Sequence, residues 1–278
     1  MRVQQWYKNF LIFIPLIFSA ELLSAGTILL SVSGFILLCM ISSSSYIIND
    51  IRDLETDRKH PEKSKRPLPA GQISVNAAFA VAVLLFLAAA VLGYYMNAGF
   101  LAFLIALFIS NIAYTFYLKK VAIVDIHMIA GNSIIRALSG IYLLNAPMSP
   151  WFLLCVFLLA LLLAASKRRS ESLLLGEHKK NDRDVFKVYN EKFLDHITVI
   201  LSCSLLFSYI LFTVLSHTDT YLMLTIPFVS YIVFRYLYFV SENNRMSRNA
   251  ELILKDRSML SAILLWLASS VLILYVIR

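Results

Sequence analysis

Residues 27–57 decide the fold expected for this chain, and they read TILLSVSGFILLCMISSSSYIINDIRDLETD. No charged side chain occurs in this stretch before Asp50. A run of about 20 mostly apolar residues is long enough to cross a membrane as a helix. Because lipid offers the backbone no hydrogen-bonding partner, such a run must be helical. The stretch therefore predicts a transmembrane helix that ends in the acidic motif Asn49-Asp50-x-x-Asp53-x-x-x-Asp57.

The composition excludes a soluble globular fold for most of the chain. Of 278 residues, 59% are hydrophobic and 15% are charged, whereas a soluble chain carries about 25% charged residues. The net charge of +8 does not indicate nucleic-acid binding, because the basic residues flank the apolar runs. The three cysteines lie inside those runs and show no CxxC spacing, which argues against a disulfide framework or a zinc site.

Nine apolar runs, separated by short polar segments, are candidate membrane spans. They cover roughly residues 7–24, 27–48, 75–95, 98–118, 122–145, 150–166, 193–215, 220–240 and 258–277. The first is weak because Pro15 and Glu21 interrupt it, and the fifth is amphipathic. We therefore expect an all-α integral membrane protein with about nine transmembrane helices in a bundle, organised as a single transmembrane catalytic domain over residues 1–278.

The distribution of basic residues predicts the orientation. Cytoplasmic loops of membrane proteins carry an excess of Lys and Arg. With a cytoplasmic N-terminus, 22 of the 25 Lys and Arg lie on the cytoplasmic side, and only Arg278 lies on the other side. Arg136 and Arg235 fall within the membrane. We therefore expect a multi-pass protein of the cell (inner) membrane whose polar residues act at the cytoplasmic face.

The acidic motif at the end of the second run is the strongest sign of a binding site. At 100° per residue, Asp50, Asp53 and Asp57 fall within about 60° of one face of a helix. Carboxylates at such short separations repel one another unless a cation lies between them. Mg²⁺ prefers oxygen ligands and is often shared with substrate phosphates. The alternative is a solvated charged loop, in which neighbours such as Arg52 and Arg58 neutralise the acids.

A basic loop follows the acidic motif and reads His60-Pro61-Glu62-Lys63-Ser64-Lys65-Arg66-Pro67-Leu68-Pro69-Ala70-Gly71. Arg offers phosphate a bidentate fork and Lys offers it a point charge. Lys63, Lys65 and Arg66 are therefore candidate phosphate ligands. Binding of anionic lipid headgroups by a basic loop next to the membrane is the alternative.

Two further sets of polar residues lie in or beside later runs. Asp125 and Arg136 lie near one helix face of the fifth run, about 16 Å apart along its axis. Ionisable residues in a membrane usually face a cavity or a partner, and a structural ion pair with another helix explains them equally well. The segment Lys167-Arg168-Arg169-Ser170-Glu171 ends the sixth run, and a local pair between its first and last residues is the alternative to a binding role.

Together these motifs resemble the UbiA superfamily of intramembrane prenyltransferases over essentially the whole chain. The resemblance rests on the spans, the acidic motif, Arg66-Pro67-Leu68-Pro69-Ala70-Gly71, and Tyr114, Lys119, Asp125, Arg136 and Gly140. The superfamily typically carries a second Asp-rich motif after span six, which binds a second Mg²⁺ on a prenyl diphosphate. This sequence has the basic segment 167–171 there instead.

Within the superfamily, the chain looks most like the decaprenyl-phosphate phosphoribosyltransferase branch. Similar elements are Arg2-Val3-Gln4-Gln5-Trp6-Tyr7-Lys8-Asn9, His60-Pro61-x-Lys63, Ser149-Pro150-Trp151-Phe152 and Lys167-Arg168-x-x-Glu171. Phosphoribosyl pyrophosphate carries a 5-phosphate besides its diphosphate, so a basic second cluster suits it. The resemblance implies Mg²⁺-dependent transfer of 5-phosphoribose from phosphoribosyl pyrophosphate to a polyprenyl phosphate, with release of pyrophosphate.

The resemblance also implies roles for particular residues. Those expected to hold Mg²⁺ are Asn49, Asp50, Asp53 and Asp57, and those expected to act in catalysis are Asp50, Asp53, Asp57 and Lys119. The expected substrate-binding residues are Lys8, Asn9, Lys63, Arg66, Tyr114, Arg136, Lys167, Arg168 and Glu171. The expected partners are phosphoribosyl pyrophosphate, a polyprenyl phosphate lipid and the membrane, without nucleic acid, and a homo-oligomer is left open. Two alternatives remain: prenyl transfer from a prenyl diphosphate to an aromatic acceptor, and a non-enzymatic membrane transporter.

Overall fold

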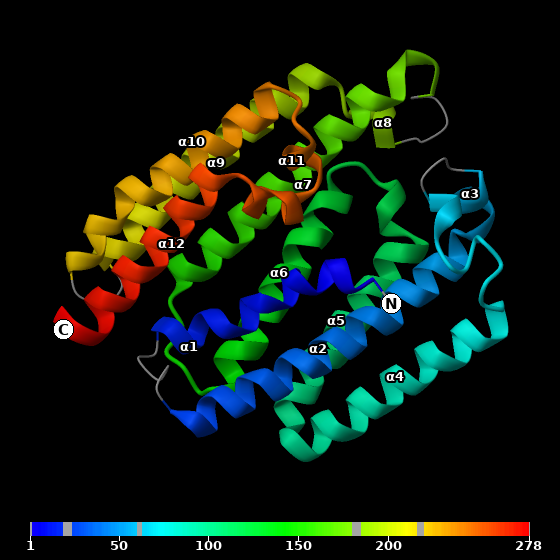
Figure 1. Cartoon of the computed structure of the whole chain (residues 1–278), viewed down its shortest axis with the longest axis horizontal. Helices are drawn as coiled ribbons and strands as arrows, with labels where there is room; N and C mark the ends of the chain where they lie inside the picture. Colours follow the sequence, from blue (N-terminus) through cyan, green and yellow to red (C-terminus); the bar gives the residue numbers. More distant parts are fainter. Residues whose placement is uncertain (1, 19–23, 60–62, 180–184, 216–219, 278) are drawn as a thin grey trace. The chain divides into compact units, whose positions relative to one another are not determined.

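The computed structural model describes residues 2–18, 24–59, 63–179, 185–215 and 220–277 (Figure 1). Every regular element in these ranges is helical, which confirms the expected all-α fold. In the same ranges, seven helices are long and apolar enough to cross a membrane. They are Ala25–Arg52, Val75–Met96, Ala98–Phe116, Pro150–Leu173, Glu191–Leu215, Tyr221–Ser241 and Arg257–Val276.

These seven helices correspond to seven of the nine expected spans. The first expected span contains most of a 3₁₀ helix, η1 (Val3–Phe13), and a short α-helix, α1 (Ile14–Phe18), while its end, with Glu21, lies outside the described residues. The fifth forms α6 (Val124–Leu143), which carries charged residues among its apolar ones. The count of nine spans and the cytoplasmic N-terminus stay predictions.

The chain divides into two compact units, each built from segments that are distant in the sequence. Unit 1 consists of Met1–Leu16, Leu22–Lys119 and Ile135–Ala146. Unit 2 consists of Ile17–Glu21, Lys120–Ile134 and Pro147–Arg278. The single catalytic domain expected over residues 1–278 stays a prediction.

Unit 1 is organised around α2 (Ala25–Arg52), which lies beside α4 (Val75–Met96), α5 (Ala98–Phe116) and η1 (Figure 1). Side chains determine where α4 and α5 begin. The Ser74 hydroxyl accepts a hydrogen bond from the Ala77 N–H at 3.2 Å, and the Asn97 side chain accepts from the Gly99 and Phe100 N–H groups at 2.8 and 3.2 Å. The buried core of this unit consists of Ile12, Leu37, Leu38, Ile41, Ala89, Phe100, Leu104, Leu107 and Leu143.

Gly140 allows η1 to lie close to α6. A Cβ atom at this position would be 2.6 Å from the carbonyl oxygen of Ile12 and 3.0 Å from its Cα. Backbone atoms cannot move aside as the end of a flexible side chain can, so only glycine fits. This approach brings Asn9 of η1 within hydrogen-bonding distance of Arg136, one turn before Gly140.

Unit 2 is organised around two long helices that lie side by side, α7 (Pro150–Lys179) and α9 (Glu191–Leu215) (Figure 1). Its other elements are α8 (Val185–Val188), η5 (Thr220–Thr225), α10 (Ile226–Ser241), α11 (Arg245–Arg248), η6 (Ala250–Lys255), α12 (Arg257–Leu272) and η7 (Ile273–Ile277). Leu162, Leu194 and Phe239 are among its core residues. Because α7 continues well past the expected end at residue 166, the basic segment 167–171 lies within a helix and not after one.

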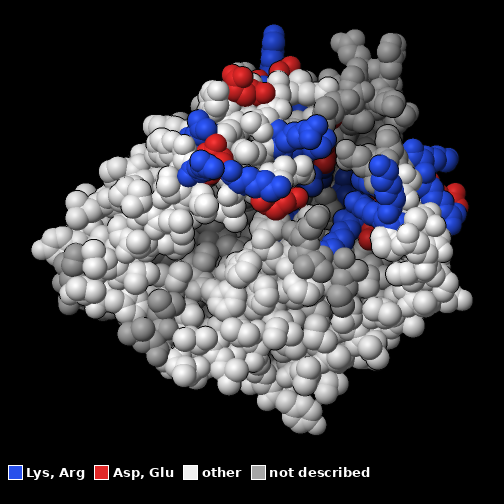
Figure 2. All heavy atoms as spheres, in the orientation of Figure 1, with Lys and Arg blue, Asp and Glu red and all other residues white. Residues whose placement is uncertain are grey.

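The surface of the molecule agrees with a lipid environment. Large areas of the face seen in Figure 2 carry no charged side chain. On α4, Phe79, Leu84 and Leu87 are 55%, 68% and 54% exposed. Exposed apolar side chains along a helix that is long enough to span a membrane are covered by lipid tails.

Candidate active site

The acidic motif lies where α2 ends. α2 ends at Arg52 and α3 (Leu54–Arg58) begins after Asp53, so the expectation that one continuous helix carries the motif is wrong. The hydrogen bonds from the Asp53 N–H to the Asn49 carbonyl (3.0 Å) and from the Asp57 N–H to the Asp53 carbonyl (2.8 Å) nevertheless continue across the break. The break is therefore local, and the acidic residues follow one another along the chain with helix-like spacing.

Arg66 connects the first and last carboxylates of the motif. Its Nη1 atom donates to Asp57 Oδ2 at 2.7 Å and to Asp50 Oδ1 at 3.5 Å. The side chain of Asp57 is only 3% exposed, and Lys63 Nζ lies 3.6 Å from its other oxygen. The expected meeting of Lys63 and Arg66 with the acidic motif is thus present within unit 1.

The loop that carries Arg66 is held by a tight turn. The Ala70 N–H donates to the Arg66 carbonyl at 2.9 Å, and the Gly71 N–H donates to the Leu68 carbonyl at 3.1 Å. Gly71 has a φ of 75°, which favours glycine because it has no Cβ. The preceding residues His60, Pro61 and Glu62 lie outside the described residues.

Asp53 is paired with Lys119, which lies 66 residues further along the chain. Lys119 Nζ lies 2.6 Å from Asp53 Oδ1, and both side chains are partly exposed. Beside them, the Asn49 side-chain oxygen accepts a hydrogen bond from the Thr115 hydroxyl at 3.4 Å. α5 and the residues after it therefore bring Lys119 to the acidic motif, as the predicted site requires.

Arg2 is a further cation at the motif that the sequence analysis did not assign to it. Its guanidinium forms an ion pair with Asp50 and lies over the ring of Tyr46, 5.5 Å from the ring centroid. The basic residues proposed as local partners behave differently. Arg52 lies 5.5 Å from the ring centroid of Phe116, and Arg58 is exposed. The acids are therefore paired with Arg2, Lys63, Arg66 and Lys119, cations from outside the motif.

The carboxylates suit a hard cation chemically, yet the structure does not gather them into a metal site. Over the described ranges of the chain, no group of three or more His, Cys, Asp or Glu side chains is arranged to hold a metal ion. Nη1 of Arg66 instead lies within reach of both Asp50 and Asp57, where a shared cation would bind. Carboxylate oxygens are ligands that Mg²⁺ prefers, so the donor set fits Mg²⁺ if Arg66 moves aside.

Asn9 and Arg136 form a buried polar pair in unit 1. Asn9 has no exposed surface, and its Oδ1 accepts hydrogen bonds from Arg136 Nε at 2.7 Å and from the Ser42 hydroxyl at 3.3 Å. Its amide nitrogen lies 3.2 Å from Cys39 Sγ. Since Arg136 is also only 3% exposed, the two residues support one another, and their contact with a substrate stays a prediction.

Lys8 and Tyr114 are the other expected substrate-binding residues of unit 1. The Lys8 ammonium lies 5.9 Å from the ring centroid of Tyr7, and Tyr114 is half-buried on α5. Their predicted contact with a substrate is not tested by these positions.

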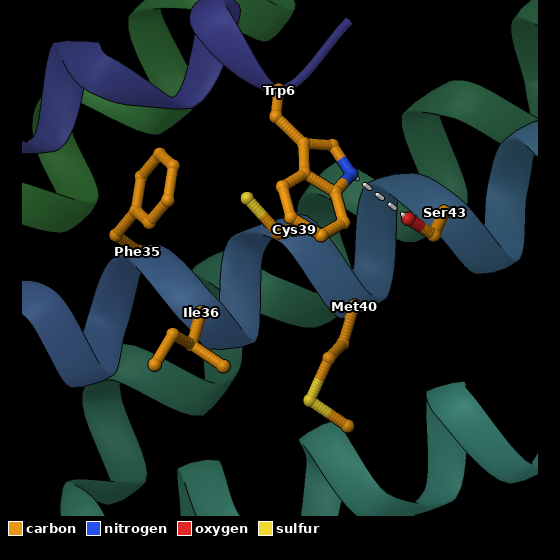
Figure 3. A pocket seen from close by; sticks show the side chains of 6 residues that line it. All are labelled: Trp6, Phe35, Ile36, Cys39, Met40 and Ser43. Carbon is orange, nitrogen blue, oxygen red and sulfur yellow. Dashed lines mark hydrogen bonds between the residues drawn. The ribbon is translucent and has the colours of Figure 1, made fainter. Parts of the chain in front are cut away.

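An apolar pocket of about 130 Å³ lies between η1 and α2 (Figure 3). Its lining residues are Trp6, Phe35, Ile36, Cys39, Met40 and Ser43. The Trp6 indole donates a hydrogen bond to the Ser43 hydroxyl at 3.2 Å, which fixes the ring beside α2. The lining is mainly hydrocarbon and sulfur, so the pocket suits an apolar group.

In unit 2, Arg168 of α7 lies between two carboxylates. Its Nε is 2.6 Å from Asp125 Oδ2, and its Nη1 is 2.5 Å from Glu171 Oε2. Asp125 has no exposed surface. Asp125 thus forms an ion pair with another helix, and Glu171 pairs with the residue three positions before it, while the role of these residues stays a prediction. Lys167 is exposed on the same helix.

Arg169, although adjacent, serves the packing of unit 2. It donates to Asp195 at 2.5 Å, to the Asn243 side chain at 2.5 Å and to the Val240 carbonyl at 2.9 Å, and Glu191 lies 3.4 Å away. These acceptors belong to α9, to α10 and to the residues after α10. Residues Asn181-Asp182-Arg183-Asp184, further along the sequence, lie outside the described residues.

The fold is that of a helical membrane protein, and its acidic motif lies among Lys and Arg side chains. The chain belongs to the UbiA prenyltransferase family, which matches residues 11–255. It is 32% identical over 219 residues to the decaprenyl-phosphate phosphoribosyltransferase of Mycolicibacterium smegmatis, covering 75% of this chain and 67% of that protein. Over 215 residues it is 31% identical to the protein of the same name from Corynebacterium glutamicum, with coverages of 76% and 65%.

The chain thus spans about two thirds of the length of these relatives. Its fold is that of a solved UbiA homolog from Archaeoglobus fulgidus bound to GPP and Mg²⁺. That comparison gives a TM-score of 0.75 at 17% identity and covers 99% of this chain and 98% of the other. At this identity the likeness shows the fold alone.

Proposed function

We propose that this protein transfers 5-phosphoribose from phosphoribosyl pyrophosphate to a polyprenyl phosphate, releasing pyrophosphate. The observation that carries the proposal is the 32% identity to a relative named decaprenyl-phosphate phosphoribosyltransferase. A second observation supports it. Segment 167–171 of α7 carries Lys167 and Arg168 where the superfamily typically has a second acidic motif, and a donor with an extra phosphate requires more cations.

The bond changes of this reaction balance without a redox partner. The bond between C1 of the ribose and the diphosphate oxygen breaks, and its electron pair leaves with pyrophosphate. An oxygen of the lipid phosphate bonds to C1 in its place. Because that phosphate is already an anion, no strong general base is required. The tasks left to the protein are to bind, orient and neutralise the two substrates.

The acidic motif would hold Mg²⁺ through Asn49, Asp50, Asp53 and Asp57. When bound, the metal supplies positive charge to the departing diphosphate and orients the donor. The solved relative bound to GPP and Mg²⁺ supports a metal in this fold. In exchange, the cations now paired with the carboxylates, including Arg66 and Lys119, would turn to the phosphates of the donor.

Lys63 and Lys8 would add charge near the donor and acceptor phosphates, with Asn9, Tyr114 and Arg136 supporting them. In unit 2, Lys167, Arg168 and Glu171 would bind the end of the donor that carries the ribose 5-phosphate. The acceptor phosphate would lie at the cytoplasmic surface of the membrane with its isoprenoid tail among apolar helices. Phosphoribosyl pyrophosphate is a soluble metabolite, so this orientation gives it access.

A comparison of donors tests the proposal. Purified protein with Mg²⁺ is incubated with phosphoribosyl pyrophosphate and a polyprenyl phosphate, and in parallel with a prenyl diphosphate and an aromatic acceptor. The proposal requires a phosphoribosylated lipid in the first reaction and no product in the second. The reverse outcome would establish the prenyltransferase alternative.

A further inference from the structure

A buried tyrosine holds the carboxylate that in turn holds Arg168. Tyr189 follows α8 in unit 2 and has no exposed surface. Its hydroxyl donates to Asp125 Oδ1 at 2.5 Å. The other carboxylate oxygen of Asp125 accepts from Arg168 Nε at 2.6 Å. Both oxygens of Asp125 are therefore engaged, and the position of Arg168 depends on the position of Tyr189.

The backbone at Ile123 fixes the direction of the Tyr189 hydroxyl. The Ile123 N–H donates to the Tyr189 oxygen at 2.6 Å. Ile123 has a φ of 69°, a strained conformation for a β-branched residue that persists only where its surroundings hold it. Since the hydroxyl oxygen accepts this hydrogen bond, its own hydrogen faces Asp125. Burial, followed by the bond to Asp125, raises the pKa of Tyr189, so the hydroxyl stays a donor at working pH.

The two adjacent arginines of α7 differ in their surroundings. Arg169 is buried and donates to acceptors on three parts of unit 2. The side chain of Arg168 is 14% exposed and contacts the two carboxylates of Asp125 and Glu171. Arg168 is thus held in a defined orientation while it still reaches the surface.

We infer that Tyr189 is a positioning residue which, through Asp125, orients Arg168 toward a phosphate monoester. Binding of phosphate by a guanidinium is directional and often bidentate, so a change in the orientation of Arg168 weakens it. For the identity of the ligand, the 5-phosphate end of phosphoribosyl pyrophosphate, the inference rests on the proposed function.

The test measures how well ribose 5-phosphate protects Arg168 from modification by phenylglyoxal, read by peptide mass spectrometry on the full-length protein. In the wild type, ribose 5-phosphate is expected to slow the modification of Arg168. Tyr189→Phe removes only the hydroxyl and is expected to raise the half-protecting concentration about tenfold.

Tyr209→Phe is the matched control. Tyr209 is also buried in unit 2, and its hydroxyl is bonded to Thr225 and to the Trp266 indole. Its loss is expected to lower the melting temperature and to leave the protection of Arg168 unchanged. Should Tyr189→Phe fail to give a monodisperse protein, Asp125→Asn is expected to shift the protection in the same direction.

Equal protection in the wild type and Tyr189→Phe would overturn the inference, and so would an absence of protection in the wild type. Turnover of phosphoribosyl pyrophosphate is measured separately. Protection without turnover contradicts the proposed function alone. Turnover with unshifted protection contradicts the inference alone.

Discussion

The carboxylate of Asp57, with a side chain only 3% exposed, lies 2.7 Å from the guanidinium of Arg66. The same nitrogen atom of Arg66 lies 3.5 Å from Asp50. A positive charge of the protein therefore stands where the proposed function requires Mg²⁺. Two cations cannot share that position, so the arrangement makes Arg66 a competitor of the metal.

We expect Arg66→Gln to increase the stabilisation that Mg²⁺ confers. Without divalent ions, the substitution is expected to lower the melting temperature, because the buried Asp57 loses its main partner. A ligand that binds only the folded state stabilises it by RT ln(1 + L/Kd) at a free concentration L, so tighter Mg²⁺ binding gives a larger rise in the melting temperature. Melting curves over a series of MgCl₂ concentrations measure both effects. The control is Arg58→Gln, which removes one positive charge from an exposed position on α3. An identical rise in melting temperature with Mg²⁺ in both variants would contradict the competition between Arg66 and the metal.

Lys119→Gln is expected to lower turnover by two to three orders of magnitude, on the order of the loss when a charge-stabilising donor is removed. Its effect on stability should be small, because the pair with Asp53 is partly exposed and screened by solvent. Arg235→Gln breaks a pair of similar exposure, with Asp256 in unit 2, and should leave turnover unchanged. Steady-state kinetics measure the turnover of both variants, and melting curves measure their stability. Equal turnover in the two would remove Lys119 from the site.

Gly140→Ala is expected to destabilise the protein by about 1–3 kcal/mol, the usual range for overpacking. The added Cβ would meet the backbone of Ile12 and push η1 away, which also separates Asn9 from Arg136. Gly131→Ala, on the same helix, places its new Cβ where no atom lies within 4 Å apart from its chain neighbours and the backbone of its own helix, so it should be neutral or slightly stabilising. Denaturation of the two variants in the same detergent compares them. An equal loss of unfolding free energy in both variants would contradict the close approach of η1 to α6.

The stabilisation that ionised Asp256 gives to the N-terminus of α12 is expected to be lost at acid pH. The hydrogen bond from Arg235, and next the one from the Met259 N–H, lower the pKa of Asp256 from its ordinary value of 3.8. A carboxyl whose pKa is lower in the folded state stabilises above its unfolded pKa, and this contribution is lost as the pH falls through the folded pKa. The melting temperature should therefore fall more steeply below about pH 4 in the wild type than in Asp256→Asn. Asn still caps a helix, so the substitution isolates the charge, and parallel curves would refute the assignment.

The sequence predicts those features that depend on local pattern. Apolar runs of sufficient length became α2, α4, α5 and α9 near their expected limits, and the acidic motif lies at the end of its helix. The pairing of Lys63 and Arg66 with that motif follows from their nearness in the chain.

Contacts between distant segments were not predictable in this way. Arg2 reaches Asp50 across 48 residues, and Tyr189 reaches Asp125 across 64, and no local pattern predicts either contact. The break at Asp53 was missed because the spacing of the acids alone fits a continuous helix. The extension of α7 to Lys179 was missed because charged residues end a hydrophobic run without ending a helix.

In the proposed reaction phosphoribose moves to the lipid and pyrophosphate is released, and the acidic motif would hold the Mg²⁺ that supplies positive charge to the leaving group. The most direct measurement supplies phosphoribosyl pyrophosphate labelled in its ribose, with a polyprenyl phosphate and Mg²⁺, and follows the label into the lipid together with free pyrophosphate. Equal amounts of labelled lipid and pyrophosphate are expected from the wild type, and neither product is expected from Asp50→Asn or in the presence of a chelator. Labelled lipid formed at the wild-type rate by Asp50→Asn, or no labelled lipid from folded wild-type protein, would contradict the proposed reaction.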